Sequence, residues 1–231
     1  MILKERKRIG EIMDDPDLSS EQLHTALNGL RRINVVSFTA LLIWQEIKSH
    51  VNKKKDFSVL DIGCGSGDII CALEELAAKD GITLRTLGLD INPLTIEFAS
   101  KIALSRGSLA KFECKNVLSE CLPDGFSVVI SSLFLHHLSD HEVQSLLKAM
   151  AISAELVLIS DLKRSLRSYL LAAFATRLLS FSHVVHVDAL RSVCAAFTKK
   201  EILELAKAAD LKNIKMKSVF PGRFLLSARS N

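Results

Sequence analysis

One stretch of ten residues constrains the fold more than any other part of this chain. A β-rich run, Val59 to Ile62, leads into three glycines at alternate positions, Gly63, Gly65 and Gly67, and a helical pattern follows. Glycine is needed where the backbone turns sharply or where a ligand approaches the main chain closely. A strand, a glycine loop and a helix in this order predict an α/β fold with a ligand at the carboxyl end of the strand.

The sequence after this loop continues to alternate between strand and helix. Apolar runs such as 127–130 and 156–159 are typical of parallel strands covered on both faces. We therefore expect a doubly wound, seven-stranded, mostly parallel sheet in a Rossmann-like arrangement. The expected strands are 57–62, 84–90, 110–115, 126–132, 155–160, 213–219 and 223–229, and the expected helices are 67–79, 93–105, 140–152, 165–182 and 198–210.

Two regions are expected outside this sheet. Residues 1–55 are expected to be an N-terminal helical extension, and residues 56–231 the main domain. An apolar, helical insertion at 162–195 is expected to form, with the extension, a lid over a substrate. In the extension, one helix face is marked by apolar residues every three or four positions, namely Ile33, Val36, Ala40, Ile43, Ile47 and Val51.

The residues around the glycine loop indicate which ligand it binds. A dinucleotide fingerprint needs a further glycine where this chain has Asp68, and no Gly-Lys-Ser/Thr follows to make a Walker loop. Asp61 would repel a pyrophosphate, but it suits a ligand that carries an ammonium and a sulfonium group. Asp90 ends the next strand, 23 residues after Gly67, where the fold presents a carboxylate to a ribose. These features favour S-adenosylmethionine as the cofactor.

The segments 59–67 and 89–93 resemble the cofactor-binding motifs of class I S-adenosylmethionine-dependent methyltransferases, and the resemblance covers residues 57–160. It implies the methyltransferase variant of the Rossmann-like fold, with S-adenosylhomocysteine as product. The methionine part would lie on Asp61 and the glycines, the ribose on Asp90 and the adenine against Ile91. Asn116 stands where the family usually has Asp. Its side-chain carbonyl would accept a hydrogen bond from the adenine amino group, but it lacks the negative charge of a carboxylate. The implied cofactor site is Asp61, Gly63, Gly65, Gly67, Asp90, Ile91, Asn116, Val117 and Leu133.

Missing motifs narrow the class of acceptor. No D/N-P-P-Y/F motif follows the fourth strand, which disfavours an exocyclic amine, and no Pro-Cys pair indicates a cysteine adduct. Catechol-type enzymes place a metal-binding Asp where Ser131 and Ser132 stand here. The His183-x-x-His186-x-Asp188 run has the spacing of neither a helical pair nor a zinc knuckle. We therefore expect a metal-independent reaction with no metal ligands.

His136 and His137 are the candidate catalytic residues. Ser139 and Glu142 form a capping box that begins the next helix, so both histidines fall in the loop at the mouth of the expected site. An imidazole, with an ordinary pKa of about 6.5, suits removal of the proton of a phenol or an enolisable ring carbon. The sequence does not choose between the two histidines, and a packing or capping role is the alternative.

Asp161, Arg164 and Trp44 are the candidate substrate residues. After the fifth strand, Arg164 would hold an anionic or phenolate oxygen and Asp161 would orient a hydroxyl group. The alternative is that these two pair with each other or cap the helix that begins at Ser165. Trp44, the only tryptophan, is either a pocket wall or a core residue.

Segments near both ends resemble a bacterial methyltransferase subgroup often encoded beside type III polyketide synthases. The matching segments are 13–18, 26–34, 161–165, Asp188 and 192–193. This resemblance, and a more distant one to quinone-pathway methyltransferases, implies a small lipophilic acceptor of secondary metabolism. The methylated atom would be a phenolic or polyketide-type hydroxyl or a ring carbon. A mean hydropathy of +0.26 agrees with an apolar pocket and equally with a homodimer face.

Composition leaves two other function classes open. The net charge of +4 is too mild to indicate a nucleic-acid partner, yet basic clusters at 4–8 and 53–55 would suit an RNA or protein methyltransferase. A non-catalytic S-adenosylmethionine-binding protein is the other alternative. No secretory signal is evident, the apolar run 169–181 is interrupted by Arg177, and five cysteines form no CxxC pair. A cytoplasmic protein with no membrane span is expected.

Overall fold

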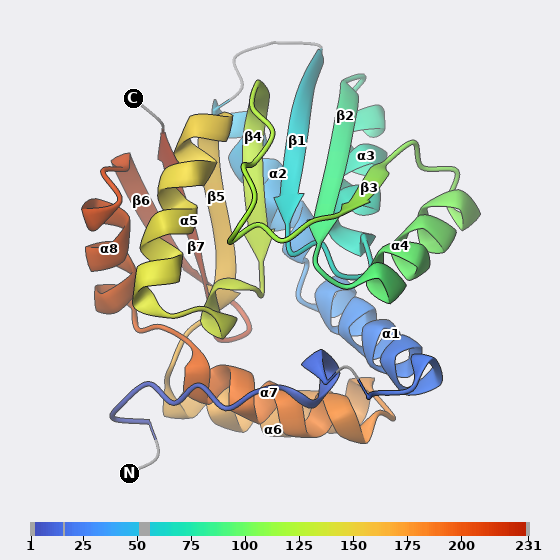
Figure 1. Cartoon of the computed structure of the whole chain (residues 1–231), viewed down its shortest axis with the longest axis vertical. Coiled ribbons are helices and arrows are strands. Elements are labelled where there is room, and N and C mark those ends of the chain that lie inside the picture. The colour runs from blue at the N-terminus through green and yellow to red at the C-terminus, as the bar shows by residue number, and fades with distance from the viewer. Residues whose placement is uncertain (1–2, 16, 51–55, 230–231) are drawn as a thin grey trace.

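The computed structural model describes residues 3–15, 17–50 and 56–229, and within them seven strands form one sheet (Figure 1). Their order is β3-β2-β1-β4-β5-β7-β6. The first five strands are parallel, and β7 is antiparallel to both of its neighbours. The expected doubly wound, seven-stranded sheet is confirmed. The bounds are β1 Asp56–Ile62, β2 Thr83–Asp90, β3 Lys111–Cys114, β4 Phe126–Ser132, β5 Ala154–Leu162, β6 Lys212–Val219 and β7 Arg223–Arg229.

Helices cover both faces of the sheet. One face packs on α2 and α3 through a cluster that includes Trp44 and Leu73, and the other packs on α5 and α8 through Met150 and Ile202. The bounds are α1 Ser20–Val36, α2 Thr39–His50, α3 Asp68–Lys79, α4 Pro93–Ser105, α5 Asp140–Ser153, α6 Leu166–Leu179, α7 His183–Ala195 and α8 Lys199–Ala208.

Local capping fixes the starts of α4 and α5. The Ser139 hydroxyl accepts from the Glu142 N–H, and the Glu142 carboxylate accepts from the Ser139 N–H, so the expected capping box is present. Asn92 caps α4, with Pro93 at the first helical position. Both caps follow parallel strands, and they place the loops after β2 and β4 at the same edge of the sheet.

A further group of elements lies across the carboxyl ends of the parallel strands (Figure 1). It consists of α1, α6, α7 and the N-terminal segment, residues 3–15, which contains the 3-10 helix η1 (Ile12–Asp14). Helix α6 packs against α7 and α1, and the N-terminal segment runs along α7. Because ligands bind at this edge of a doubly wound sheet, these elements bound the candidate site.

The expected helix face at 33–51 is divided between two helices. Helix α1 ends at Val36 and α2 begins at Thr39. Between them, the Ser37 hydroxyl donates to the carbonyl oxygen four residues earlier at 2.7 Å, and Phe38 has a left-handed φ of 52°. A hydroxyl that bonds to the preceding turn competes with the helical backbone, which accounts for the break. Val51 of this face and Lys53, Lys54 and Lys55 of the basic cluster lie outside the described residues.

Helix α7 covers a segment for which the sequence predicted no element. Ser182 caps it by accepting a hydrogen bond from the Val185 N–H. His183 is exposed, the His186 ring lies 2.8 Å from the carbonyl oxygen of Ser180, and Asp188 faces η1. This run is therefore helical, and its three polar residues have separate surroundings.

Candidate active site

The glycine loop between β1 and α3 adopts a conformation that favours glycine. Gly63, Gly65 and Gly67 have φ angles of 68°, 52° and 69°, in the left-handed region. A Cβ atom at Gly67 would lie 2.6 Å from the Phe112 ring, whereas one at Gly65 would meet nothing within 4 Å. Close packing therefore requires glycine at position 67, and Gly65 faces open space.

Asp90 ties this loop to the end of β2. One of its carboxylate oxygens accepts from the Gly65 N–H at 3.1 Å, and the other accepts from the Asn92 N–H at 3.0 Å. Burial raises the pKa of Asp90, while the two backbone donors oppose the rise. The structure thus brings Asp90 next to the glycine loop, as the sequence predicts for two neighbouring parallel strands.

Asp61 is a buried carboxylate with an unsatisfied oxygen. It is 2% exposed, and its Oδ1 has no hydrogen-bond partner among the residues that the structure describes. Burial, and then the neighbouring carboxylates of Asp68 and Asp90, raise the pKa of Asp61 well above its usual range. Buried charges in proteins are normally paired. A cationic ligand would supply the missing partner.

The loop opens into a cleft of ≈ 650 Å³, called here the loop cleft. Its walls are the glycine loop, residues 90–95, residues 132–134, and parts of α1 and the N-terminal segment. Ile91 and Leu133, both predicted cofactor residues, line it, and Ile91 is 63% exposed.

Asn116 and Val117 are not among the residues that line the loop cleft. The Asn116 side-chain oxygen accepts from the Leu118 N–H at 3.0 Å, and Val117 packs against the core cluster beneath α5. Asn116 thus helps to shape the turn after β3, and contact of this pair with an adenine edge stays a prediction.

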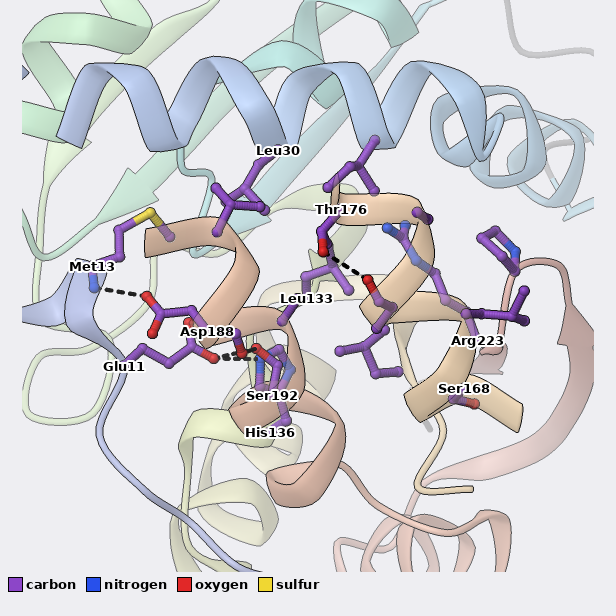
Figure 2. A pocket seen from close by; sticks show the side chains of 18 of the residues that line it. Glu11, Met13, Leu30, Leu133, His136, Ser168, Thr176, Asp188, Ser192 and Arg223 are labelled. Atoms are coloured by element: carbon purple, nitrogen blue, oxygen red, sulfur yellow. Dashed lines mark hydrogen bonds and ion pairs between the residues drawn. The ribbon is translucent and has the colours of Figure 1, made fainter. Parts of the chain in front are cut away.

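A second space, the apolar cavity, has a volume of ≈ 130 Å³ and lies between α6, α7, α1 and the N-terminal segment (Figure 2). Polar side chains stand at opposite ends of it, with Glu11, His136 and Ser192 at one end and Arg223 at the other (Figure 2). Most of the wall between them is aliphatic, namely Leu30, Ile33, Leu162, Leu171, Val184 and Val185.

The loop cleft and the apolar cavity share four lining residues, Met13, Leu30, Leu133 and His137. Leu133 follows β4 directly, with a φ of 56°, and its N–H donates to the Ser160 carbonyl oxygen at 2.9 Å. A left-handed conformation is uncommon for leucine and is held only where the surroundings impose it. A group in the apolar cavity would face a ligand in the loop cleft across these four residues.

His136 is buried among carboxylates at one end of the apolar cavity. Its Nδ1 lies 2.7 Å from Asp161 Oδ1, its backbone N–H donates to Asp161 Oδ2 at 3.2 Å, and its Nε2 lies 3.5 Å from Glu11 Oε1. Burial alone would lower the pKa of His136, but Asp161 and Glu11 outweigh it and raise the pKa to about 10. His136 is therefore an imidazolium at neutral pH.

His137 lies at the junction of the two spaces. Its Nδ1 is 3.2 Å from Asp14 Oδ2, its Nε2 is 3.8 Å from Glu11 Oε2, and its side chain is 24% exposed. The ring centroids of the two histidines are 4.4 Å apart. Because His137 lines both spaces and His136 lines only the cavity, His137 is the histidine placed to reach a group that faces the loop cleft.

Glu11 completes this cluster, and no sequence motif indicated it. Its carboxylate faces both histidines and accepts a hydrogen bond from the Ser192 hydroxyl. Burial would raise the pKa of Glu11, but its contacts with the histidines and Ser192 lower it. One ligand atom each of Glu11, His136 and His137 lies within 4.8 Å of the others, so these residue types also fit a metal site. A lone glutamate far from its partners in sequence gives no local signal.

Asp161 and Arg164 do not reach the apolar cavity. Asp161 is 1% exposed and orients the His136 ring rather than a substrate hydroxyl. Arg164 donates to Glu201 at 2.5 Å and to the Ala196 carbonyl oxygen at 2.7 Å. Both substrate predictions are therefore corrected, because these side chains serve contacts within the protein.

Trp44 is a core residue rather than a pocket wall. It is 1% exposed, its indole N–H donates to Asp80 at 2.7 Å, and its ring stacks on Phe57 at 5.8 Å. The prediction that Trp44 is a pocket wall is wrong, and the alternative, a core residue, is confirmed.

Arg223, rather than the predicted Arg164, is the arginine that lines the apolar cavity. It begins β7, is 3% exposed, lines the apolar cavity and donates to the Thr39 hydroxyl at 2.7 Å. Burial lowers the pKa of Arg223 to about 10, against the raising effect of Asp161 and Asp68. Arg223 thus remains a cation at neutral pH at the end of the cavity opposite Glu11.

Polar contacts hold the N-terminal segment over the site. Arg6 donates to the carbonyl oxygens of His136 and Leu138 at 2.9 and 2.6 Å. Asp188 of α7 accepts from two backbone N–H groups of η1 at 2.8 and 2.9 Å. Part of the basic cluster at 4–8 is therefore used inside the protein rather than on a surface for a polyanion.

Comparisons with known proteins agree with this arrangement. A protein family described as "Methyltransferase domain" matches residues 59–153, from β1 to the end of α5, which is less than half of the chain. No curated protein matches the chain. Among the described residues, no helix is both long and apolar enough to cross a bilayer.

Solved structures match over more of the chain. Human N-acetylserotonin methyltransferase in complex with S-adenosylmethionine has a TM-score of 0.64 at 15% identity, over 92% of this chain and 57% of that one. The methyltransferase SibL has a TM-score of 0.63 at 18% identity, over 85% of this chain and 55% of that one. Mitomycin 7-O-methyltransferase MmcR has a TM-score of 0.60 at 22% identity, over 84% of this chain and 54% of that one. The chain therefore has the S-adenosylmethionine-dependent methyltransferase fold, and it spans just over half the length of these structures.

Proposed function

We propose that this protein transfers a methyl group from S-adenosylmethionine to a small lipophilic acceptor, at a phenolic or polyketide-type hydroxyl or a ring carbon. The observation that carries the proposal is the junction of the loop cleft and the apolar cavity at Leu133 and His137. A donor in the cleft and an acceptor in the cavity would meet there, and methyl transfer from a sulfonium depends mainly on such positioning.

The electrostatics of the loop cleft support S-adenosylmethionine as the donor. Asp61, Asp68 and Asp90 lie close enough for each of the other two carboxylates to raise the pKa of Asp61, after the larger effect of burial. A ligand that brings an ammonium and a sulfonium would offset this negative charge. We assign Asp61 to the ammonium group, Asp90 to the ribose and Ile91 to the adenine.

The size and charge of the apolar cavity support a small aromatic acceptor. An engineered protein cavity of about 150 Å³ binds benzene, so a space of ≈ 130 Å³ suits one aromatic ring. Arg223 would hold an anionic oxygen at one end, while the opposite end carries the histidines. Mitomycin 7-O-methyltransferase and N-acetylserotonin methyltransferase, which share the fold, are named for small acceptors.

We assign proton removal to His137 and a positioning role to His136. The acceptor's proton moves to His137, the acceptor atom bonds to the methyl carbon, and the electron pair of the broken S–C bond stays on sulfur. With burial outweighed by Asp161 and Glu11, the pKa of His136 is about 10, so this ring is a fixed cation rather than a base. A fixed cation near the acceptor favours its phenolate form.

We propose that the reaction needs no metal, although Glu11, His136 and His137 have suitable ligand types. The proton of His136 already compensates the carboxylates of Asp161 and Glu11, and a metal ion would have to displace it. Turnover is expected to survive dialysis against EDTA unchanged. A loss that added divalent metal restores would instead identify the cluster as a metal site.

We also propose that the N-terminal region and residues 162–195 close over the acceptor. Met13 and Glu11 from one region, and Leu171, Val184 and Ser192 from the other, line the apolar cavity. Such closure would exclude water while the methyl group moves.

Calorimetric titration with S-adenosylmethionine and S-adenosylhomocysteine tests the cofactor site. Asp90→Ala should abolish binding, and Glu97→Ala, an exposed acid on α4, should leave it unchanged. Release of S-adenosylhomocysteine in the presence of phenols and quinols then tests turnover. Cofactor binding without turnover of any acceptor would favour a non-catalytic binding protein. No binding by the folded wild-type protein would refute the proposal.

A further inference from the structure

Helix α6 presents an apolar stripe on the face that points away from the cavity. Four residues at intervals of four are 64%, 59%, 68% and 67% exposed, namely Leu166, Leu170, Phe174 and Leu178. Phe181, just beyond the helix, is 93% exposed. In Figure 1 this helix lies at the edge of the molecule, on the far side of the site from the sheet. Contiguous exposed apolar side chains of this size mark interaction surfaces.

The same face of α6 is positively charged. With 3.6 residues per turn, Arg167 and Arg177 fall between the apolar residues of the stripe, and both are exposed. From residue 162 to residue 187 the sequence has no Asp or Glu, against four Lys or Arg and two His. The stripe therefore combines large apolar side chains with cations, and residues 162–187 supply no acid to compensate them.

A third exposed aromatic residue lies near the start of this helix. Phe220, 75% exposed, is in the turn between β6 and β7. That turn contacts α6, because the Ser168 hydroxyl donates to the Gly222 carbonyl oxygen at 3.1 Å. The apolar surface thus has contributions from two elements that are packed together.

We propose that the outer face of α6 docks on the surface of a membrane that contains anionic lipid. The helix has 14 residues, which is about 21 Å of length, and this is shorter than the roughly 30 Å of a bilayer's hydrocarbon core. The helix would lie along the interface, with the stripe in the acyl boundary and the two arginines at the lipid phosphates.

The charge on this face disfavours a second copy of the chain as its occupant. In a twofold-symmetric contact the same patch meets itself. Arg167 and Arg177 of both copies would then share one apolar interface without a carboxylate from this face. Like charges placed opposite each other weaken an interface, whereas anionic lipid supplies the complementary charge.

Membrane docking would also give a lipophilic acceptor a short path to the site. The inner face of α6 lines the apolar cavity through Leu171, Ala172, Ala175 and Thr176. One helix therefore separates the proposed membrane face from the acceptor space. This consequence depends on the proposed methyl transfer, but the docking itself does not.

Vesicle co-sedimentation of the full chain, without cofactor or acceptor, tests the docking separately from turnover. The wild-type protein should bind vesicles of phosphatidylcholine with phosphatidylglycerol and bind pure phosphatidylcholine more weakly. Each cation near an anionic surface contributes about a fivefold factor, so Arg167→Gln/Arg177→Gln should weaken binding about thirtyfold. Phe174→Glu/Leu178→Glu should abolish binding.

Leu104→Glu is the matched control, because Leu104 is 82% exposed on α4 and lies outside the stripe. It should bind vesicles like the wild type, and circular dichroism melting should show that all variants remain folded. The proposal is overturned if the folded wild-type protein binds neither kind of vesicle, or if the Phe174/Leu178 variant binds like the wild type. It is also overturned if light scattering shows a wild-type dimer that Phe174→Glu dissociates, which would assign the face to a second copy.

Discussion

At the scale of single residues, Gly65 offers the most direct test of the loop cleft. Its φ is 52°, and an added Cβ would meet nothing of the protein within 4 Å, so a methyl group there would occupy the cleft itself. In Gly65→Ala we expect at least about a tenfold loss of S-adenosylmethionine affinity and a stability loss of about 1–2 kcal/mol from the left-handed backbone. Calorimetry and urea unfolding measure the two effects.

Gly81→Ala is the matched control for this prediction. Gly81 has a φ of 69° and equally open surroundings, but it does not line the loop cleft. We expect Gly81→Ala to lose the same stability as Gly65→Ala and to keep the wild-type affinity for S-adenosylmethionine. Equal affinity losses in both variants would mean that strain, rather than occupation of the cleft, weakens binding.

His137→Gln tests the proposed base. General-base assistance contributes about 10²- to 10⁴-fold to a rate, so kcat should fall by a factor in this range while cofactor affinity is unchanged. His141→Gln, at an exposed position of α5, is the control. An unchanged kcat in His137→Gln would remove this residue from the mechanism.

At the scale of elements, the N-terminal segment depends on Asp188 of α7. Asp188→Ala leaves two N–H groups of η1 without their acceptors, at about 1–3 kcal/mol for each donor that stays buried. We expect the segment to detach, the acceptor KM to rise and trypsin to cut within residues 3–15 sooner. Glu204→Ala on α8 serves as control, since its side chain is 63% exposed. Unchanged proteolysis would show that other contacts suffice to hold the segment.

The elements also separate what the sequence could predict from what it could not. The start of α4 follows from Asn92 and Pro93, which act within one turn, and both ends of this helix were predicted correctly. The break at Ser37 and the helix that follows Ser182 depend on single hydroxyl contacts that apolar periodicity does not reveal.

The candidate site divides in the same way. The glycine loop and Asp90 belong to local motifs, so both were found. Glu11 and Arg223 reach opposite ends of the apolar cavity only through the packing of distant segments, and Arg164 was preferred because it follows the fifth strand directly.

At the scale of the whole molecule, buried charge makes stability depend on pH. Burial lowers the pKa of His136, but Asp161 and Glu11 outweigh burial and raise this pKa to about 10. In an unfolded chain the pKa of a histidine is about 6.5. The folded protein holds this proton more tightly, so the stabilisation is complete below about pH 6.5 and is lost as the pH rises towards 10. Because one proton is involved, the free energy of unfolding changes by at most about 1.4 kcal/mol per pH unit.

Urea unfolding across this pH range measures the effect. The free energy of unfolding of the wild-type protein should fall as the pH rises, and His136→Gln should show a flatter dependence. Equal slopes in the two proteins would locate the titrating group elsewhere.

The anchoring of the N-terminal segment has a consequence for how the protein is made. Arg6 and Glu11 are synthesised more than a hundred residues before their partners His136 and Ser192. Contacts so far apart in sequence form late, because a long loop must close before they contribute. The N-terminal segment is therefore among the last parts of this chain to settle, because synthesis must pass Ser192 before the candidate site can assemble.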